Sequence, residues 1–333
     1  MKTASFLYKN NSFCKERNDE DLKFEEAQLV IGFGSSALVS REESFKDIKN
    51  RFPNAKIAMC SSAGEIYENE VLDDSISLVA IQFQTTILKT SEINIQDFNS
   101  SYEAGKTLIM NLSQEKLKFV FVLSDGGKVN GSELVKGMNF SKNKNVLITG
   151  GLAGDGTSFE KTFVGLNQVP ETGKIIAIGF YGDNLVLSHG SFGGWESFGL
   201  ERTATKSIEN VLYQIDGKSA LSLYKTYLGK FAEELPGSAL LFPLSVKFDD
   251  HQEAMVRTIL SVDNENHSIT FAGDIPQGSK IKFMKANFDR LIDAASDAAN
   301  SCLEMENNKP KLALLISCVG RKLIDRKSTR LNS

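Results

Sequence analysis

The feature that most constrains the fold is a pattern of elements that occurs twice, about ninety residues apart. The stretch "MCSSAGEIYENE" (59–70) follows a short apolar run, and so does "GGLAGDGTSFEK" (150–161). Each places Ala-Gly and then an acid at its turn, as Ala63-Gly64-Glu65 and Ala153-Gly154-Asp155. A chain that repeats a small-residue turn in this way is best explained by an internal duplication.

The elements around the two turns follow the same order of strand, helix, strand, turn and further strands. β-branched and aromatic runs predict the strands, and one apolar face predicts each helix. In the first copy these are a strand at 27–38, a helix at 42–52, a strand at 55–60 and a hairpin at 74–84 and 85–95. In the second copy they are strands at 118–127, 145–150, 161–167, 173–182 and 184–192, with a helix at 131–140.

The two copies align at a nearly constant offset. A shift of 90 residues places Gly34-Ser35-Ser36 on Ser124-Asp125-Gly126, and Gly64-Glu65 on Gly154-Asp155. A shift of 97 residues places "VAIQF" (79–83) on "IAIGF" (176–180). Duplicated units pack about a pseudo-twofold axis, which brings equivalent turns together. We therefore expect the matching turns to form two halves of one cleft.

The second part of the chain has a different pattern. A helix is predicted at 219–228 and another at 287–305, with hairpin-type turns between strands in the stretch that separates them. These strands, at 239–248, 253–263, 267–275 and 279–286, predict an antiparallel meander. "KLALLISCVGRKL" (311–323) is interpreted as a buried strand.

The predicted fold class is therefore α/β to α+β: a duplicated N-terminal domain of β-α-β plus β-hairpin units, and a smaller α+β C-terminal domain with the meander. The expected divisions are an N-terminal extension at 1–26, the duplicated domain at 27–210, a truncated C-terminal domain at 211–323, and an unstructured tail of non-native sequence at 324–333.

Composition excludes several classes of function. The net charge of −4 and the pI of about 5.6 argue against a nucleic-acid partner, which would favour clustered Lys and Arg. The chain has no apolar run long enough to cross a bilayer and no secretory signal at its start, so we expect a cytoplasmic protein without a membrane contact. The four cysteines (14, 60, 302 and 318) and three histidines have no metal-site spacing, so no metal is expected.

The turns are the candidate ligand site. Their small residues leave backbone N–H groups and hydroxyls accessible, and their acids could bind an ammonium or a hydroxyl. This combination predicts a small polar ligand such as an amino acid. The candidate binding residues are Gly34, Ser35, Ser36, Ser61, Ser62, Gly64, Glu65, Asp125, Gly126, Gly151, Gly154 and Asp155.

Two other interpretations stay open. "CSSAG" (60–64) resembles part of a nucleophile elbow, which would make the chain a hydrolase using Ser62 or Cys60 with His189 as the base. Alternatively, His189 in "VLSHGSFGGW" could be a haem ligand. A tight turn and an ordinary strand-end histidine are the simpler explanations of these two features.

The sequence also resembles a known family. "LVIGFGSSAL", "MCSSAGEIYENEVLDDSISLVAIQF", "VLITGGLAGDGTSFEKTFVGLN" and "GSFGGWESFG" are similar to the FIST N-terminal domain. "VLYQIDGKSALSLYKTYLG", "AGDIPQGSKIKFM" and "LLISCVGRKL" are similar to the FIST C-terminal domain. The resemblance covers roughly residues 27–323.

The resemblance implies an intracellular sensory module that binds a small ligand and has no catalytic activity of its own. Amino acids are the ligands proposed for many members, and a subset similar to the nitric-oxide-sensing NosP proteins binds haem as a cofactor. Such sensors regulate histidine kinases or cyclic-di-GMP enzymes. Because no such output segment is recognisable in this sequence, the partner is expected to be a separately encoded protein.

Overall fold

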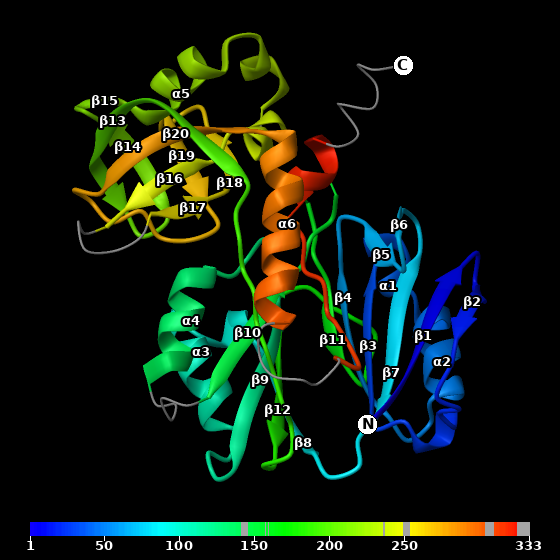
Figure 1. Ribbon diagram of the computed structural model, residues 1–333. Helices are drawn as coiled ribbons and strands as arrows, with labels where there is room; N and C mark the ends of the chain where they lie inside the picture. The colour runs from blue at the N-terminus through cyan, green and yellow to red at the C-terminus, as the bar shows by residue number, and fades with distance from the viewer. Residues whose placement is uncertain are drawn as a thin grey trace, which may run out of the picture. The chain divides into compact units, whose positions relative to one another are not determined.

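The computed structural model describes residues 1–140, 146–156, 158, 160–235, 237–248, 254–303 and 310–324. The chain divides into two compact units. Unit 1 comprises Met1–Leu187 together with Lys309–Ser317, and unit 2 comprises Ser188–Asn308 together with Cys318–Ser333. The elements of each unit can be followed in Figure 1.

Unit 1 contains two large sheets. The first, sheet A, has the strand order β11-β4-β3-β7-β1-β2. Its strands are β1 (Lys2–Lys9), β2 (Ser12–Arg17), β3 (Leu29–Gly34), β4 (Lys56–Ser61), β7 (Ile76–Gln82) and β11 (Val164–Leu166). β3 and β4 are parallel, whereas β7 is antiparallel to both β3 and β1. A small hairpin, β5 (Glu65–Tyr67) with β6 (Glu70–Leu72), follows β4.

The second sheet of unit 1, sheet C, repeats the central part of sheet A. Its order is β10-β9-β12-β8, with the strands β8 (Ile87–Asn94), β9 (Leu117–Ser124), β10 (Leu147–Leu152) and β12 (Lys174–Tyr181). β9 and β10 are parallel, and β12 is antiparallel to β9 and β8. The orders β4-β3-β7-β1 and β10-β9-β12-β8 therefore agree in sequence and in strand sense. This agreement confirms the internal duplication.

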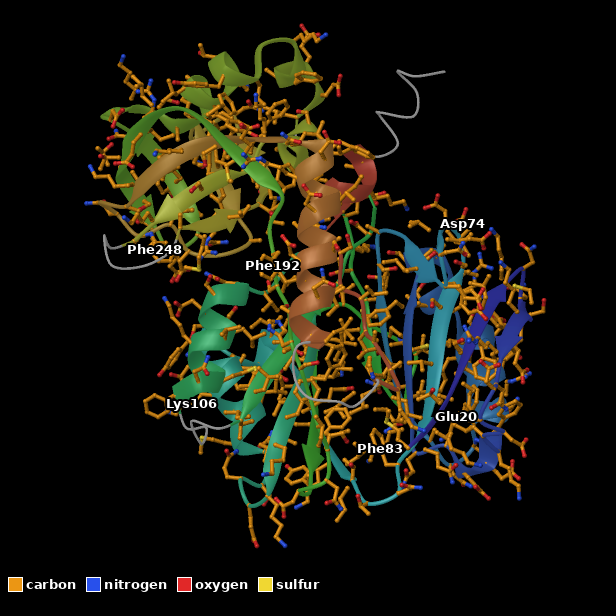
Figure 2. The ribbon with its side chains drawn as sticks, in the orientation of Figure 1. Glu20, Asp74, Phe83, Lys106, Phe192 and Phe248 are labelled. Atoms are coloured by element: carbon orange, nitrogen blue, oxygen red, sulfur yellow. The ribbon has the colours of Figure 1, made fainter. Side chains whose placement is uncertain are left out.

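The two sheets face each other across one apolar layer, which we name the inter-sheet core. Its buried side chains alternate along the strands, as a sheet with a covered face requires. They include Leu29, Ile31, Ala58, Cys60, Ile81, Phe83, Phe119, Phe121, Leu123, Val164, Ile176, Ile178 and Phe180. Phe83, labelled in Figure 2, meets Phe180 edge to face with ring centroids 5.9 Å apart.

Helices cover the outer face of each sheet. α1 (Ser36–Val39) and α2 (Glu42–Arg51) pack on sheet A through Leu38, Val39 and Ile48. α3 (Ser101–Met110) and α4 (Gly131–Phe140) pack on sheet C through a separate cluster of apolar side chains. α3 and α4 cross closely, because a Cβ at Gly137 would lie 2.0 Å from the carbonyl oxygen of Tyr102. Unit 1 is therefore a layered helix–sheet–sheet–helix structure.

The N-terminal extension takes part in this fold. β1 pairs with β7 along seven residues, and Phe6 and Tyr8 are completely buried. The Arg51 guanidinium stacks on three aromatic rings of this region, with the nearest ring, that of Phe13, 4.4 Å away. No element was expected in residues 1–26, although the alternation of "KTASFLYK" is typical of a half-buried strand.

Unit 2 is built on one antiparallel sheet with the order β17-β16-β20-β13-β14-β19-β18, and β15 pairs with β14. The strands are β13 (Trp195–Ile208), β14 (Val211–Ile215), β15 (Lys218–Ser219), β16 (Leu244–Lys247), β17 (Met255–Arg257), β18 (Ile259–Asp263), β19 (Ser268–Phe271) and β20 (Lys280–Ala286). The helices are α5 (Ala220–Leu228) and α6 (Phe288–Leu303). The antiparallel character of this region, its α+β class and both helices agree with the sequence predictions.

Three sequence predictions are wrong in detail. The hairpin expected at 74–95 does not form, because both neighbours of β7 are already taken by β1 and β3, and β8 joins sheet C instead. The strand expected at 184–192 is absent: these residues have no regular structure, and Gly190 packs against the backbone of α6, where a Cβ would lie 2.1 Å from the Ala298 oxygen.

The third wrong prediction is the buried strand at 311–323. Residues 312–318 are in neither a strand nor a helix, and Leu315 is 64% exposed. Residues 319–324 form a helical turn. Apolar composition alone favoured burial here, but a strand also needs a neighbour to pair with. The tail beyond residue 324 lies outside the described residues.

Candidate functional site

The candidate site lies where the two parallel strand pairs of unit 1 end. Open α/β sheets bind ligands at the carboxyl ends of parallel strands, because the loops that follow meet there. β3, β4, β9 and β10 are followed by the loops Gly34–Ser36, Ser61–Glu65, Ser124–Gly127 and Leu152–Asp155, which we name the carboxyl-end loops. All twelve residues predicted from the sequence lie in these loops or, for Gly151, at the end of β10.

Direct contacts join the carboxyl-end loops of the two halves. The Gly154 N–H donates to the Ser61 carbonyl at 3.1 Å. The Phe163 N–H donates to Ser61 Oγ at 2.9 Å, and the Ser61 N–H donates to the Phe163 carbonyl at 2.8 Å. Ser61 therefore connects the end of β4 to the loop after β10 and to the strand that follows it. The structure brings the 61–65 and 152–155 loops together, as the duplication predicted.

A second pair of loops is joined in the same way. The Gly126 N–H donates to Thr162 Oγ1 at 2.9 Å, and a Cβ at Gly126 would lie 2.0 Å from the Ala153 carbonyl oxygen. The Ala153 N–H donates to the Ser124 carbonyl at 2.8 Å. Glycine at position 126 is therefore required by a close backbone approach. These loops touch each other directly.

Equivalent hydrogen bonds define the correspondence between the halves. The Ser35 N–H donates to the Ser75 carbonyl at 3.0 Å, and the Asp125 N–H donates to the Lys174 carbonyl at 3.0 Å. Ser35 and Asp125 thus occupy the same position, as the shift of 90 residues predicted. The side chain at this position is a small hydroxyl in one half and a carboxylate in the other.

The correspondence changes by one residue at the next loop. The Ser62 N–H donates to the Gly34 carbonyl at 2.8 Å, as the Ala153 N–H does to Ser124, so Ser62 corresponds to Ala153. The ninety-residue alignment of Glu65 with Asp155 is therefore wrong by one position. A one-residue change is invisible in a sequence alignment of short loops, because Ala, Gly and Ser are interchangeable there.

Glu65 is bound by two serine hydroxyls. Its side chain is 1% exposed, and Ser62 Oγ donates to one carboxylate oxygen at 2.8 Å while Ser75 Oγ donates to the other at 2.9 Å. A buried carboxylate needs such donors. The Glu65 carboxylate therefore has partners within the fold, in addition to any part that it takes in ligand binding.

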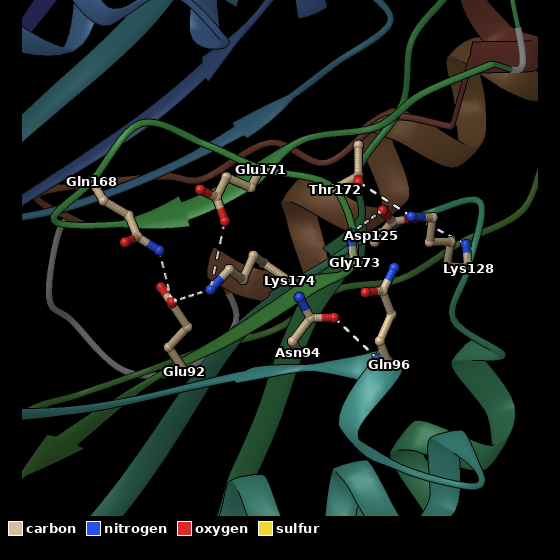
Figure 3. A network of polar contacts seen from close by, with 10 residues as sticks. All are labelled: Glu92, Asn94, Gln96, Asp125, Lys128, Gln168, Glu171, Thr172, Gly173 and Lys174. Atoms are coloured by element: carbon tan, nitrogen blue, oxygen red, sulfur yellow. Dashed lines mark hydrogen bonds and ion pairs between the residues drawn. The ribbon is translucent and has the colours of Figure 1, made fainter.

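Asp125 is bound by backbone amides, as Figure 3 shows for Gly173. Its side chain is buried, and one oxygen accepts from the N–H groups of Gly127 and Lys128 at 2.8 and 2.9 Å. The other oxygen accepts from the Gly173 N–H at 2.6 Å. Asp125 thus fixes its own loop to the start of β12.

An ion-pair network continues from this point along the edge of sheet C (Figure 3). The Lys174 ammonium lies 3.0 Å from a Glu92 oxygen and 3.7 Å from Glu171, and Gln168 donates to the same Glu92 oxygen at 2.8 Å. The hydrogen bond to Glu92 raises the pKa of Lys174 above its usual value. This network stabilises the β12 side of the site.

Asp155, the third predicted acid, closes its own loop. One of its oxygens accepts from the N–H groups of Glu160 and Lys161, at 2.6 and 3.0 Å. It is half-buried, unlike Glu65 and Asp125. The predicted capture of a ligand ammonium by these three acids stays a prediction, but each of them already has donors in the fold.

Three serine hydroxyls at the site lack a hydrogen-bond partner among the described residues. They are the Oγ atoms of Ser35, Ser36 and Ser124, and each of these atoms is buried. Most buried polar side-chain atoms in proteins have a partner, so such groups call for an explanation. Ser35 and Ser36 precede and begin α1, and Ser124 ends β9.

The residues of the alternative interpretations are placed less favourably for chemistry. Cys60 is buried, and burial raises the pKa of its thiol to about 12, so it stays protonated. The Ser62 hydroxyl donates to Glu65, and the chain after it forms a strand hairpin instead of the helix that follows a nucleophile elbow. His189 is exposed and belongs to unit 2. Haem ligation by His189 stays a prediction.

Sequence reasoning missed three residues that support the site. The Ser75 hydroxyl donates to Glu65, and the Thr162 hydroxyl accepts from the Gly126 N–H. The Ser124 hydroxyl has no partner among the described residues. Ser75 and Thr162 lie just before strands that return to the site, a position that no motif marks. Ser124 could have been found, because it aligns with Gly34 in the duplicated pattern.

A comparison with protein-family models decides the family. The model of the FIST N domain matches residues 28–218, and that of the FIST C domain matches residues 220–332. The chain belongs to the FIST family. No curated protein matches this FIST chain. The boundary between the two matches falls inside unit 2, since the structure divides at Leu187 and Ser188.

FIST domains are small-ligand sensory domains of signalling proteins, and membership therefore assigns this FIST chain to sensing. Among the described residues, no helix is both long and apolar enough to span a membrane. The described residues also contain no group of three or more His, Cys, Asp or Glu side chains arranged to hold a metal ion.

Proposed function

We propose that this FIST protein binds an amino-acid-like ligand at the carboxyl-end loops of unit 1 and signals its presence to a separately encoded partner. The partner class is a histidine kinase or a cyclic-di-GMP enzyme. Three observations support the proposal. The chain belongs to the FIST family, the loops of both halves are hydrogen-bonded to each other, and three buried serine hydroxyls in these loops have no hydrogen-bond partner among the described residues.

The observation that carries the ligand site is the set of unpartnered hydroxyls. Leaving a buried hydroxyl without a partner costs about 1–3 kcal/mol, so folding alone gives no reason to place Ser35, Ser36 and Ser124 at the ends of β3 and β9. A ligand that hydrogen-bonds them would recover that cost. Because these atoms are buried, ligand entry requires the loops to shift, which is the behaviour expected of a sensor.

The chemistry of the loops suits a ligand with both donors and acceptors. A serine hydroxyl can donate to a carboxylate and accept from an ammonium. The carboxylates of Glu65 and Asp125 are already bound by internal donors, so hydroxyls and backbone groups would make most of the ligand contacts. A free amino acid presents both kinds of group at the spacing of a few atoms.

A thermal-shift screen of the full chain against the L-amino acids tests the ligand. A ligand at one hundred times its Kd stabilises the folded protein by about 2.7 kcal/mol, which corresponds to a rise in Tm of several degrees. The Ser35→Ala/Ser36→Ala double variant should lose this rise. Ser222→Ala, an exposed serine of α5, is the matched control and should keep it. A shift that survives the double variant would contradict the proposed site.

The partner is tested by mixing the purified chain with a histidine kinase and, separately, with a diguanylate cyclase. The expected result is a change in autophosphorylation or cyclisation rate that depends on the amino acid found in the screen. A rate that responds to the chain equally with and without the amino acid would contradict ligand-dependent signalling.

A further inference from the structure

Residues 311–317, which we name the strap, belong to a different unit from the chain segments that flank Lys309–Ser317. The chain of unit 2 ends one stretch at Asn308 and resumes at Cys318, and the residues between them belong to unit 1. The strap, drawn in orange-red in Figure 1, is therefore an element of unit 1 that is joined at both ends to unit 2. Neither the family matches nor the proposed ligand site explains it.

The first part of the strap is held by a charged contact and a partly buried side chain. Lys311 Nζ lies 2.6 Å from one oxygen of Glu20, which is labelled in Figure 2, and the other oxygen accepts from the Thr3 N–H at 2.9 Å. Next to it, the Leu312 side chain packs against the inter-sheet core. Leu312 is therefore attached to the apolar layer of unit 1.

The last part of the strap lies against β10. A Cβ at Gly151 would be 3.3 Å from Ile316 Cγ2, so the Ile316 side chain covers the face of Gly151 that points to the inter-sheet core. The equivalent residue of the first half is Cys60, whose strand β4 is paired on its outer side with β11. Among the described residues β10 is the last strand of sheet C, and the strap covers its inner face.

The strap is held by side chains and forms no part of a sheet. None of residues 312–317 is in a strand or a helix, and Leu315 and Ile316 are 64% and 54% exposed. Segments with few buried contacts open at a low free energy without global unfolding. The strap can therefore leave its seat while both sheets stay folded.

The residues after the strap are fixed in unit 2. The Arg321 guanidinium donates to the carbonyls of Leu291 and Phe192, at 3.2 and 2.9 Å. A Cβ at Gly320 would lie 2.8 Å from the Leu240 carbonyl oxygen and 3.2 Å from the Trp195 ring. Only three residues separate Ile316 from this anchored turn, so they span at most about 11 Å. The strap and the anchored turn are therefore joined by a short covalent link.

We propose that the strap couples the ligand site of unit 1 to unit 2. A ligand at the carboxyl-end loops strengthens the contacts of the strap with Gly151 and the inter-sheet core, which are its seat. The strap bound in this seat then shifts the conformational equilibrium of the anchored turn of unit 2. The proposal rests on the proposed ligand site. The link is short, because Gly151 lies in the strand that leads into the loop Leu152–Asp155. Coupling of this kind is reciprocal, so loss of the seat also weakens ligand binding.

The seat is tested by thiol labelling of the full chain. The exposed or partly exposed cysteines are first replaced through Cys14→Ser, Cys302→Ser and Cys318→Ser, while the buried Cys60 is kept. The thiol introduced by Leu312→Cys should react about tenfold more slowly than the one introduced by Leu315→Cys, which reports a freely exposed position. Equal labelling rates at positions 312 and 315 would show that the Leu312 side chain is not packed against unit 1, and would contradict the proposal.

The charged contact is tested in the same background. Lys311→Met keeps an apolar stem but removes the charge that Glu20 binds, so the labelling rate at position 312 should rise several-fold. Lys282→Met removes the exposed pair with Glu201 in unit 2 and serves as the matched control, with no change expected. If both variants behave alike, the Lys311 contact does not hold the strap.

The coupling is tested with the amino acid that gives the largest thermal shift as the probe. Its addition should slow labelling at position 312 several-fold, and Ile316→Ala, which removes the side chain that contacts Gly151, should raise its Kd. If the probe raises Tm but leaves the labelling rate unchanged, the coupling is wrong and the proposed ligand stands. If no amino acid raises Tm, the proposed ligand is wrong and the coupling stated here is overturned, whatever the labelling rates without a ligand.

Discussion

The two halves of unit 1 share a topology but hold their carboxyl-end loops in different ways. In the first half Glu65 is bound by the hydroxyls of Ser62 and Ser75, whereas in the second half Asp125 is bound by three backbone amides. The Glu65 carboxylate of the first half is therefore bound by hydroxyls, which can either donate or accept a hydrogen bond. The Asp125 carboxylate of the second half is bound by backbone N–H groups, which can only donate.

The edges and outer faces of the halves differ as well. Sheet A carries the additional strands β2 and β11, while sheet C ends at β10 and β8 within the described residues. α3 and α4 cross closely over sheet C, while sheet A is covered by the shorter α1, by α2 and by an aromatic cluster around Phe6. The apolar residues of the central strands preserve the sheets through the duplication. The polar loops and the sheet edges are where the two halves differ.

The largest effect is expected from the helix crossing of the second half. Gly137→Ala places a Cβ 2.0 Å from the Tyr102 carbonyl oxygen of the other helix, so one backbone must move. We expect a loss of about 3 kcal/mol in the free energy of unfolding, measured by urea denaturation. Gly127→Ala is the control, because its Cβ would be 3.7 Å from the nearest atom, and it should change stability by less than about 0.5 kcal/mol.

The two carboxylates provide the sharpest test of the comparison. Asp125→Asn directs an amide NH2 at backbone N–H groups that cannot accept, and should cost about 2–3 kcal/mol. Glu65→Gln should cost only about 1 kcal/mol, since the hydroxyl of Ser62 or Ser75 can rotate and accept. Both values come from the same urea titration. Equal losses would show that the distinction between hydroxyl and amide donors is unimportant.

Cys60 gives a pH-dependent difference between the halves, because its counterpart is Gly151. Burial raises the pKa of its thiol from 9.0 to about 12, so the folded state keeps a proton that the unfolded state loses. This contribution is fully present below pH 9 and is lost as pH rises toward 12, by about 1.4 kcal/mol per pH unit. Denaturant titrations at pH 8 and pH 10 should show this loss in the native chain and a smaller one in Cys60→Ala. Parallel losses in both would contradict a buried thiol.

The smallest effect is expected at Ser35, the counterpart of Asp125. Its hydroxyl has no partner among the described residues, so Ser35→Ala should leave the free energy of unfolding unchanged or raise it slightly. Ser61→Ala should instead cost about 1–2 kcal/mol, because it leaves the Phe163 N–H without its acceptor. A clear loss in Ser35→Ala would show that this hydroxyl has a structural partner.

Much of the fold could be predicted from the sequence because it depends on periodicity. The continuous apolar runs of β3 and β9 and the apolar helical faces of α2 and α4 are local patterns. The offset between the copies can be found by comparing the sequence with itself. The pairing of strands, in contrast, depends on residues that are far apart in the sequence. The 74–95 hairpin failed because the sequence does not state that β1, from the unassigned N-terminal residues, already occupies the edge of β7.

The sequence was sufficient to predict which loops form the candidate site, but not which of their polar side chains are hydrogen-bonded within the fold. Small residues at the ends of parallel strands identified the four loops, and the structure brings those loops together. Which polar groups are internally bound depends on Ser75, Thr162 and Gly173, which lie 10, 36 and 48 residues from their partners Glu65, Gly126 and Asp125. No spacing rule relates these residues to Glu65 or Asp125.

The connection between β7 and β8 has an evolutionary consequence. Residues 83–86 alone carry the chain from the last strand of one copy to the first strand of the next. Each copy therefore supplies the four central strands of one sheet, and β11 of the second copy adds to the edge of sheet A. An ancestral single copy could have formed a similar sandwich as a homodimer. Gene fusion would then have required only this short linker, and it would have let the two once identical loop sets mutate independently.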